Sequence, residues 1–358
     1  MRAPDQERDD AGREKKTSHA LVIGAGVGTI DPMRIFSGIQ PTGAKHLGNY
    51  IGAIRRWADS QDEGEQFICI VDLHAITVAH DPDDLRESTL SLAALLIASG
   101  LEPDRCTLFV QSHNRDHPEA TWLLAAVASM GELRRMTQFK EKSEQQDFVS
   151  VGLFTYPVLQ AADILLYQTD AVPVGEDQRQ HVELTRDIAE RFNSRFGETF
   201  VVPQVVVPEL GAKIMDLQEP TKKMSTTGGT PQGTVLMLDE PDVLRKKIKS
   251  AVTDSGREVR RGPGKEGIEN LISIMSVATE ETPDAIEARY DSAGYGEFKT
   301  DVAEAVVELF APIQARYREL RNDPAEVRRM LAVGADKARA VSTPTLELMY
   351  ERLGFARS

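Results

Sequence analysis

Glycines flank a histidine in the stretch TGAKHLGNYIGA, residues 42–53, where a loop leads into a helical pattern of apolar residues. The first turn of a helix offers free backbone N–H groups and partial positive charge, and both suit a phosphate. Gly43 and Gly48 lack the Cβ that would keep a ligand from the backbone, and His46 can hydrogen-bond phosphate oxygens. The stretch predicts a phosphate-binding turn, although a tight turn with a surface histidine fits the same letters.

A second candidate phosphate loop, TKKMSTTGG, occupies residues 221–229. Lys222 and Lys223 supply positive charge, and hydroxyls follow at Ser225, Thr226 and Thr227. This combination suits a polyphosphate. Taken alone, the lysine pair also fits a solvated linker. Two phosphate-type loops in one chain favour a nucleotide as the ligand.

Alternating strand and helix patterns must position the first loop. The strand RIFSG at residues 34–38 precedes it, and a helix is predicted over residues 49–60. Asp81 as N-cap, Pro82 at the first helical position and Gly100 beyond the end predict another helix. Further strands are predicted at residues 66–75, 106–112 and 170–175, and further helices after residue 118 and over residues 176–195. This alternation predicts a doubly wound α/β domain with a parallel sheet.

The strand signals fade after about residue 235, and apolar residues then recur at three- and four-residue spacing, for instance over residues 301–320 and 325–341. This pattern predicts an all-helical domain. We expect an α/β domain at 33–235, which includes the loop at 222–229, and a helical domain at 236–358. The polar composition of that loop predicts that it belongs to neither core. Residues 1–32 are expected to be disordered, dispensable or untranslated; their GAGVG run is not the GxGxxG of a dinucleotide site.

Charge and composition exclude several classes of protein. The 358-residue chain carries a formal charge of −14, which argues against a protein that coats nucleic acid indiscriminately. Residues 245–265 hold eight Lys or Arg against two Asp or Glu. This basic segment fits either a local contact with RNA or a solvated helix face. No run of about 18 apolar residues is present to span a bilayer, and we expect a cytoplasmic protein. Cys69 and Cys106 are predicted to be buried thiols.

The two loops resemble the signatures of class I aminoacyl-tRNA synthetases: HLGN at 46–49 is similar to HIGH, and KMSTT at 223–227 to KMSKS. The blocks IFSGIQPTG, DLHAIT, YPVLQAADILLY and VPVGEDQRQHVELTRDIAERFN resemble the tryptophanyl-tRNA synthetases of bacteria. The likeness continues through IKSAVTDS and GYGEFK in the helical part. It implies a Rossmann-like, HUP-type catalytic domain followed by a helical anticodon-binding domain, in a homodimer.

The resemblance also assigns residues to ATP and to catalysis. The implied ATP contacts are Gln40, Pro41, Thr42, Gly48, Asn49, Gly175, Glu176, Asp177, Ile214, Lys223, Met224, Ser225, Thr226 and Thr227. The implied catalytic residues are His46, Asn49, Lys222, Lys223 and Ser225.

Asp163 matches the family's carboxylate that accepts the indole N–H. Indole nitrogen is only a donor and a carboxylate only an acceptor, so a phenylalanine side chain would leave Asp163 unpaired and be rejected. The other implied tryptophan contacts are Phe36, Gly38, His74, Gln160, Val172, Val174 and Gln178. The valines and His74 also fit an ordinary core, and Asp163 an exposed helix position. His113 and His117 have zinc-like spacing, but Pro118 predicts a loop there, so no metal site is proposed.

The implied reaction has two steps. The tryptophan carboxylate attacks the α-phosphorus of ATP and releases pyrophosphate, and a terminal hydroxyl of tRNA(Trp) then attacks the adenylate. The carboxylate is already ionised at neutral pH, so the first step needs alignment and charge stabilisation rather than a base. Mg²⁺ is expected with ATP, and no tightly bound organic cofactor, membrane or DNA partner is expected.

Two departures from the family pattern leave alternatives open. Position 160 is Gln where the bacterial type usually has Met, and Thr226 replaces the second lysine of KMSKS. Either the loop tolerates Thr226, or Lys222 supplies the missing charge; we favour the second hypothesis. The alternative functions are a tyrosyl-tRNA synthetase and a synthetase-like regulatory protein that binds tRNA or a ligand without catalysis.

Overall fold

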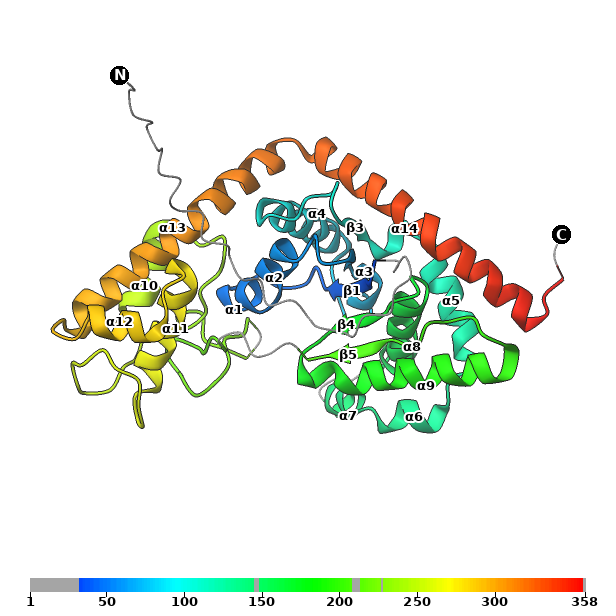
Figure 1. The fold of residues 1–358 in the computed structure, drawn as a ribbon, viewed down its shortest axis with the longest axis horizontal. Helices are drawn as coiled ribbons and strands as arrows, with labels where there is room; N and C mark the ends of the chain where they lie inside the picture. Colours follow the sequence, from blue (N-terminus) through cyan, green and yellow to red (C-terminus); the bar gives the residue numbers. More distant parts are fainter. Residues whose placement is uncertain (1–31, 145–147, 208–212, 227, 357–358) are drawn as a thin grey trace, which may run out of the picture. The chain divides into compact units, whose positions relative to one another are not determined.

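A five-stranded sheet lies at the centre of the computed structural model, which describes residues 32–144, 148–207, 213–226 and 228–356. Its strands are β1 (Arg34–Ile39), β2 (Glu65–Ile70), β3 (Thr107–Val110), β4 (Ala171–Pro173) and β5 (Gln204–Val206). All neighbours are parallel, in the order β3-β2-β1-β4-β5 (Figure 1). Strands β2 and β3 lie on one side of β1, and β4 and β5 on the other, so the order of successive strands reverses between β1 and β4. Open α/β sheets bind their ligands at such a point. The predicted doubly wound sheet is confirmed.

Helices connect the strands of this sheet. They are α1 (Leu47–Asn49), the π-helical turn η1 (Tyr50–Ile54), α2 (Arg55–Asp59), α3 (Asp72–Ala75), α4 (Pro82–Ala98), η2 (Gln111–His113), α5 (Asp116–Ala125), α6 (Met130–Arg135), α7 (Thr137–Glu144), α8 (Val151–Leu165), η3 (Glu176–Gln178) and α9 (Arg179–Phe196). Asp81 caps α4 by accepting hydrogen bonds from the backbone N–H groups of Asp83 and Asp84. The predicted helix between Pro82 and Gly100 is therefore confirmed.

The helix after the first loop differs from the predicted one. It begins at Leu47 rather than near Asn49, and η1 interrupts its α-helical hydrogen bonding. The Arg55 N–H bonds the carbonyl of Tyr50, five residues earlier. Such π turns insert one residue into a helix and often occur at functional sites. The spacing of apolar residues does not signal this insertion.

The last third of the chain is helical, as predicted: α10 (Pro241–Lys249), α11 (Glu266–Thr279), α12 (Pro283–Arg289), α13 (Tyr295–Asn322) and α14 (Pro324–Leu353). Helices α10 and α11 pack on α13, whereas α14 packs on β3, α4 and α5 (Figure 1). One hydrophobic cluster joins Ile54 and Leu96 to Ile272 and Phe310, and the chain from Pro32 onward forms one compact unit. The domain boundary at residue 235 stays a prediction.

Other expectations concern the termini, thiols and membranes. The predicted extension at residues 1–32 lies, apart from Pro32, outside the described residues. Cys69 and Cys106 are buried free thiols, as predicted. In the part of the chain that the structure describes, every helix is too short or too polar to cross a membrane.

Candidate active site

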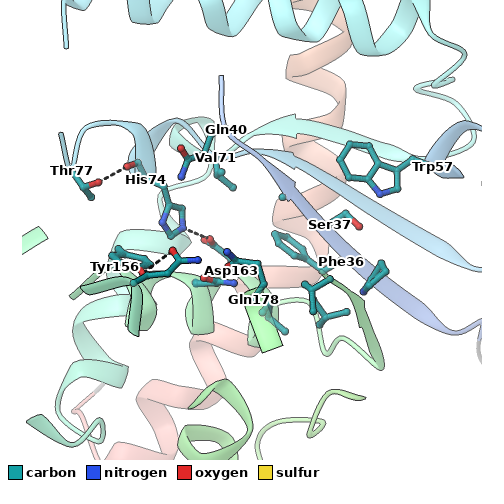
Figure 2. Close-up of a pocket in the computed structure, with 17 residues that line it drawn as sticks. Phe36, Ser37, Gln40, Trp57, Val71, His74, Thr77, Tyr156, Asp163 and Gln178 are labelled. Atoms are coloured by element: carbon teal, nitrogen blue, oxygen red, sulfur yellow. Dashed lines mark hydrogen bonds and ion pairs between the residues drawn. The ribbon is translucent and has the colours of Figure 1, made fainter. Parts of the chain in front are cut away.

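A cavity of about 360 Å³ opens where β1, β2 and β4 end. It is lined by Phe36, Ser37, Gly38, Gln40, Trp57, Val71, His74, Thr77, Gln138, Tyr156, Gln160, Asp163, Ile164, Val172, Pro173, Val174 and Gln178 (Figure 2). All eight residues that the resemblance implies for tryptophan are among them. The structure thus brings together residues from β1, α3, α8, β4 and η3 in one cavity.

Asp163 on α8 is 1% exposed and accepts three hydrogen bonds. Its Oδ1 accepts from Gln111 Nε2 at 2.6 Å and lies 2.6 Å from His117 Nδ1. Its Oδ2 lies 2.8 Å from His74 Nε2 (Figure 2). Burial opposes ionisation, but the bonds from His117 and His74 outweigh it and lower the pKa of Asp163 to about 2. A carboxylate offers about four acceptor positions, so one position of Oδ2 remains for a ligand donor.

His117 is supported from behind by other buried polar groups. Its Nε2 lies 2.8 Å from the Tyr167 hydroxyl, which accepts a hydrogen bond from Asn114 Nδ2 at 3.2 Å. The two ring nitrogens of His117 therefore link the Tyr167 hydroxyl to the Asp163 carboxylate. The predicted loop position of His117 is wrong, because α5 already begins at Asp116.

A second polar wall of the cavity comes from α7 and α8, and His181 on α9 contacts it. The Tyr156 hydroxyl lies 3.3 Å from Gln138 Oε1 and 2.8 Å from His181 Nε2. The sequence had not indicated Tyr156 or Gln138 as site residues. Tyr156 is one helical turn before Gln160 and two before Asp163, so the three- and four-residue spacing on α8 was an available signal. Nothing local marks Gln138.

His46 in the first signature is buried and neutral. Burial, together with the charges of Lys223 and Lys45, lowers the pKa of His46 to about 4. Its Nδ1 is buried without a hydrogen-bond partner. A Cβ at Gly48 would lie 3.0 Å from the His46 ring, and the Asn49 side chain accepts from the His46 N–H at 3.0 Å. These contacts explain the glycine and the asparagine that follow the histidine.

The two predicted phosphate loops converge. A Cβ on Gly43 would lie 3.3 Å from the Thr226 hydroxyl, and one on Gly48 would lie 3.9 Å from the Ile214 side chain. Met224 is 2% exposed and packs in the same cluster as Leu47. The expectation that the second loop belongs to neither core is therefore wrong at Met224, whose apolar side chain is buried. Thr227 lies outside the described residues.

The other predicted ATP residues lie at the same edge of the sheet. Gln40, Pro41 and Thr42 follow β1, and Gly175, Glu176 and Asp177 follow β4. An ion pair with Arg179 at 2.7 Å holds the pKa of Glu176 below its ordinary value. In the second loop, Lys222 forms an ion pair with Glu219, whereas Ser225 is half-buried.

Lys45, which the sequence had not singled out, braces the first loop. Its Nζ donates to the carbonyls of Gln40, Thr42 and Gly43 at 2.9, 2.8 and 3.2 Å. A Lys45→Met variant keeps the aliphatic stem but loses all three bonds. Because water replaces part of what they contribute, we expect a net loss of about 1.4 kcal/mol, which raises the KM for ATP about tenfold. Steady-state kinetics of the exchange of pyrophosphate into ATP, the activity that the resemblance implies for the first step, would check this, with the KM for tryptophan as the internal control. An unchanged KM for ATP would contradict the bracing role.

Comparisons with known proteins agree with this geometry. A family model described as class I tRNA synthetases (W and Y) matches residues 30–311. The chain is 53% identical over 329 residues to tryptophan-tRNA ligase 2 of Streptomyces avermitilis, which covers 91% of this chain and 98% of that protein. It is 51% identical over 322 residues to the tryptophan-tRNA ligase of Caldanaerobacter subterraneus, with 90% and 98% covered.

Solved structures with the same fold include two bacterial tryptophanyl-tRNA synthetases. The one from Mycoplasma pneumoniae superposes with a TM-score of 0.82 at 36% identity, over 91% of this chain and 98% of that chain. The one from Campylobacter jejuni, complexed with ADP and tryptophan, gives a TM-score of 0.81 at 35% identity, over 90% and 100%.

Proposed function

The chain belongs to the class I tRNA synthetases of tryptophan and tyrosine, and from this premise we propose that it is a tryptophan-tRNA ligase. It activates L-tryptophan with ATP and transfers the product to tRNA(Trp). The observation that carries the proposal is the convergence of both signature loops beside a cavity with a buried, ionised carboxylate, Asp163. Relatives about half identical over nearly the whole chain support the same specificity.

Asp163 orients the substrate ring in this proposal. Its free acceptor position receives the indole N–H, and the apolar lining of Phe36, Val172 and Val174 surrounds the ring. Tyr156, Gln138 and the other amides of the cavity are left to bind the α-amino group. Aromatic substrates without an N–H donor leave a buried acceptor unpaired, which costs about 1–3 kcal/mol or more for a charged group.

The first step then depends on charge placed around the phosphates. The substrate carboxylate is the nucleophile, so no side chain has to remove a proton. Lys223 faces the developing charge, with neutral His46 and the backbone at Gly48 on the other side, as electrostatic stabilisation of a phosphoryl group requires. ATP is expected to bring Mg²⁺ on its own phosphate oxygens, where the ion neutralises part of their charge.

The second substrate, tRNA(Trp), is proposed to contact the helical part of the chain. Lys246 and Lys249 on α10 are exposed, whereas Arg260 and Arg261 pair with Asp291 and with Glu287 and Asp284. Exposed lysines favour contact with the phosphates of a nucleic acid. They are the first positions to test in the basic segment.

We also propose a homodimer, supported by an exposed apolar patch. Phe148 is 79% exposed, Val151 77% and Ile76 51%. The hydroxyl of Ser150 donates to the carbonyl of Thr77 at 3.3 Å, which places these two segments side by side. Contiguous exposed apolar groups of this kind mark protein contacts. Sedimentation at micromolar concentration tests this state, and a monomer there would overturn it.

Exchange of pyrophosphate into ATP tests the function. We expect exchange that depends on tryptophan and is absent with tyrosine, followed by charging of tRNA(Trp). Exchange driven by tyrosine would favour a tyrosyl-tRNA synthetase. Absence of exchange with either amino acid, combined with binding of tRNA, would favour the regulatory alternative.

A further inference from the structure

A buried carboxylate outside both signatures ties together the loop that carries Lys222 and Lys223. Asp216 is 1% exposed. Its Oδ1 accepts hydrogen bonds from the backbone N–H groups of Gln218 and Glu219 at 2.8 and 3.1 Å. Its Oδ2 accepts from the N–H of Thr230 at 3.1 Å. One side chain therefore joins the segment before the lysines to the segment after them.

Two glycines leave room for this carboxylate. A Cβ on Gly233 would lie 1.8 Å from Oδ1 of Asp216, and a Cβ on Gly229 would lie 2.8 Å from Oδ2. Any other residue at Gly233 would displace the carboxylate or the backbone. The loop is thus built around Asp216, which gives Gly229 and Gly233 of the TTGGTPQG run a physical reason.

A second buried side chain fixes the same loop to α11. Asn270 is 4% exposed; its Oδ1 accepts from the Met215 N–H at 2.8 Å, and its Nδ2 donates to the Met215 carbonyl at 2.9 Å. Met215 forms an antiparallel bridge with Lys223. Two backbone bonds flank this bridge. The Asp216 N–H donates to the Lys222 carbonyl at 2.8 Å, and the Met224 N–H donates to the Ile214 carbonyl at 3.0 Å. The backbone of Lys223 is therefore held to α11 through one neighbouring residue.

We propose that Asp216 and Asn270 are positioning residues that hold Lys222 and Lys223 for adenylate formation. Among the residues that the structure describes, the hydrogen bonds of both side chains go to backbone atoms of the loop, and neither residue lines the cavity. A lysine side chain has several rotatable bonds, so its charge is aligned only when its backbone is fixed. The inference rests on the proposed function, because it assigns these bonds to the alignment of the second loop.

The variant Asp216→Asn tests the proposal with little change in shape. Its oxygen can still serve Gln218 and Glu219, but its Nδ2 then faces the N–H of Thr230, donor against donor. We expect kcat for tryptophan-dependent exchange to fall about tenfold, with the KM for tryptophan changed less than about twofold, because misalignment affects the transition state more than binding of the ring.

Trypsin gives a readout that does not depend on activity. If Asp216 holds the loop, trypsin should cleave folded Asp216→Asn after Lys222 and Lys223 about tenfold faster than the wild type, because local opening exposes the backbone. The matched control is Asp81→Asn. Asp81 also accepts two backbone N–H bonds through Oδ1, at 2.8 and 3.1 Å, without a third bond across a loop. Asn caps helices as well as Asp, so this control should behave as the wild type.

The outcomes separate the inference from the function. The positioning role is refuted if the wild type exchanges pyrophosphate and Asp216→Asn keeps both its kcat and its resistance to trypsin. A wild type without exchange would remove the proposed function, and faster cleavage of the variant would still support the loop anchor. If Asp216→Asn does not fold, Asn270→Ala is used in its place, with the same expected results. A kcat and a cleavage rate for Asn270→Ala equal to those of the wild type would refute the proposal.

Discussion

Replacing Lys223 with alanine is expected to slow formation of tryptophanyl adenylate by about 10²–10³-fold, the loss typical of one preorganised group that stabilises developing charge. Lys223 is close enough to His46 to lower the pKa of that histidine, and its backbone is paired with Met215. It therefore brings charge to the point where the two loops meet. Single-turnover measurement of adenylate formation, at saturating ATP and tryptophan, isolates this step from product release.

The neighbouring lysine is the matched control for that experiment. The hypothesis that Lys222 replaces the cation missing at Thr226 predicts that Lys222→Ala is nearly as damaging as Lys223→Ala. The ion pair with Glu219 argues against it, because it holds the ammonium group of Lys222 on an exposed acid. We therefore expect a loss of less than about tenfold for Lys222→Ala, as for an exposed charge. Equal losses would restore the compensation hypothesis.

Local signals in the sequence predicted the architecture well. Helix α4 begins and ends near the predicted positions because Asp81, Pro82 and Gly100 act within a few residues of the chain. The parallel sheet follows from apolar strands that alternate with helices. The resemblance to synthetases then placed eight residues in one cavity, and all eight line it.

Contacts between distant parts of the chain were not predictable in this way. Gln111 and His117 precede Asp163 by 52 and 46 residues, and no local pattern links them to it. Asp216 bonds Thr230 across a loop of polar residues that carries no periodic signal. The burial of Met224 was missed for the same reason, since the polar composition of the loop predicted that it belongs to neither core. Such features depend on how separate elements pack, which propensity and periodicity do not encode.

The buried carboxylate of the cavity gives the second large expected effect. Asp163→Ala should lower kcat/KM for tryptophan by roughly 10²-fold or more, because a hydrogen bond to a charged group contributes about 1.5–3 kcal/mol and alignment of the ring is lost as well. The variant also leaves Gln111, His74 and His117 without their acceptor. A thermal unfolding curve and the KM for ATP, expected within about twofold of the wild type, show whether the nucleotide half of the site is intact.

A methylated substrate separates recognition of the indole N–H from this structural support. In 1-methyltryptophan the indole nitrogen carries no hydrogen to donate, so the kcat/KM of the wild type should be about 10²-fold lower for it than for tryptophan. Asp163→Ala should use the two substrates about equally, apart from the effect of the bulk of the methyl group. If Asp163 only supports the fold, the mutation should lower kcat/KM by the same factor for both substrates, and the preference for tryptophan should persist. An unchanged kcat/KM for tryptophan in Asp163→Ala would reject the assignment outright, and the free acceptor position on Oδ2 would then have to serve another group of the substrate.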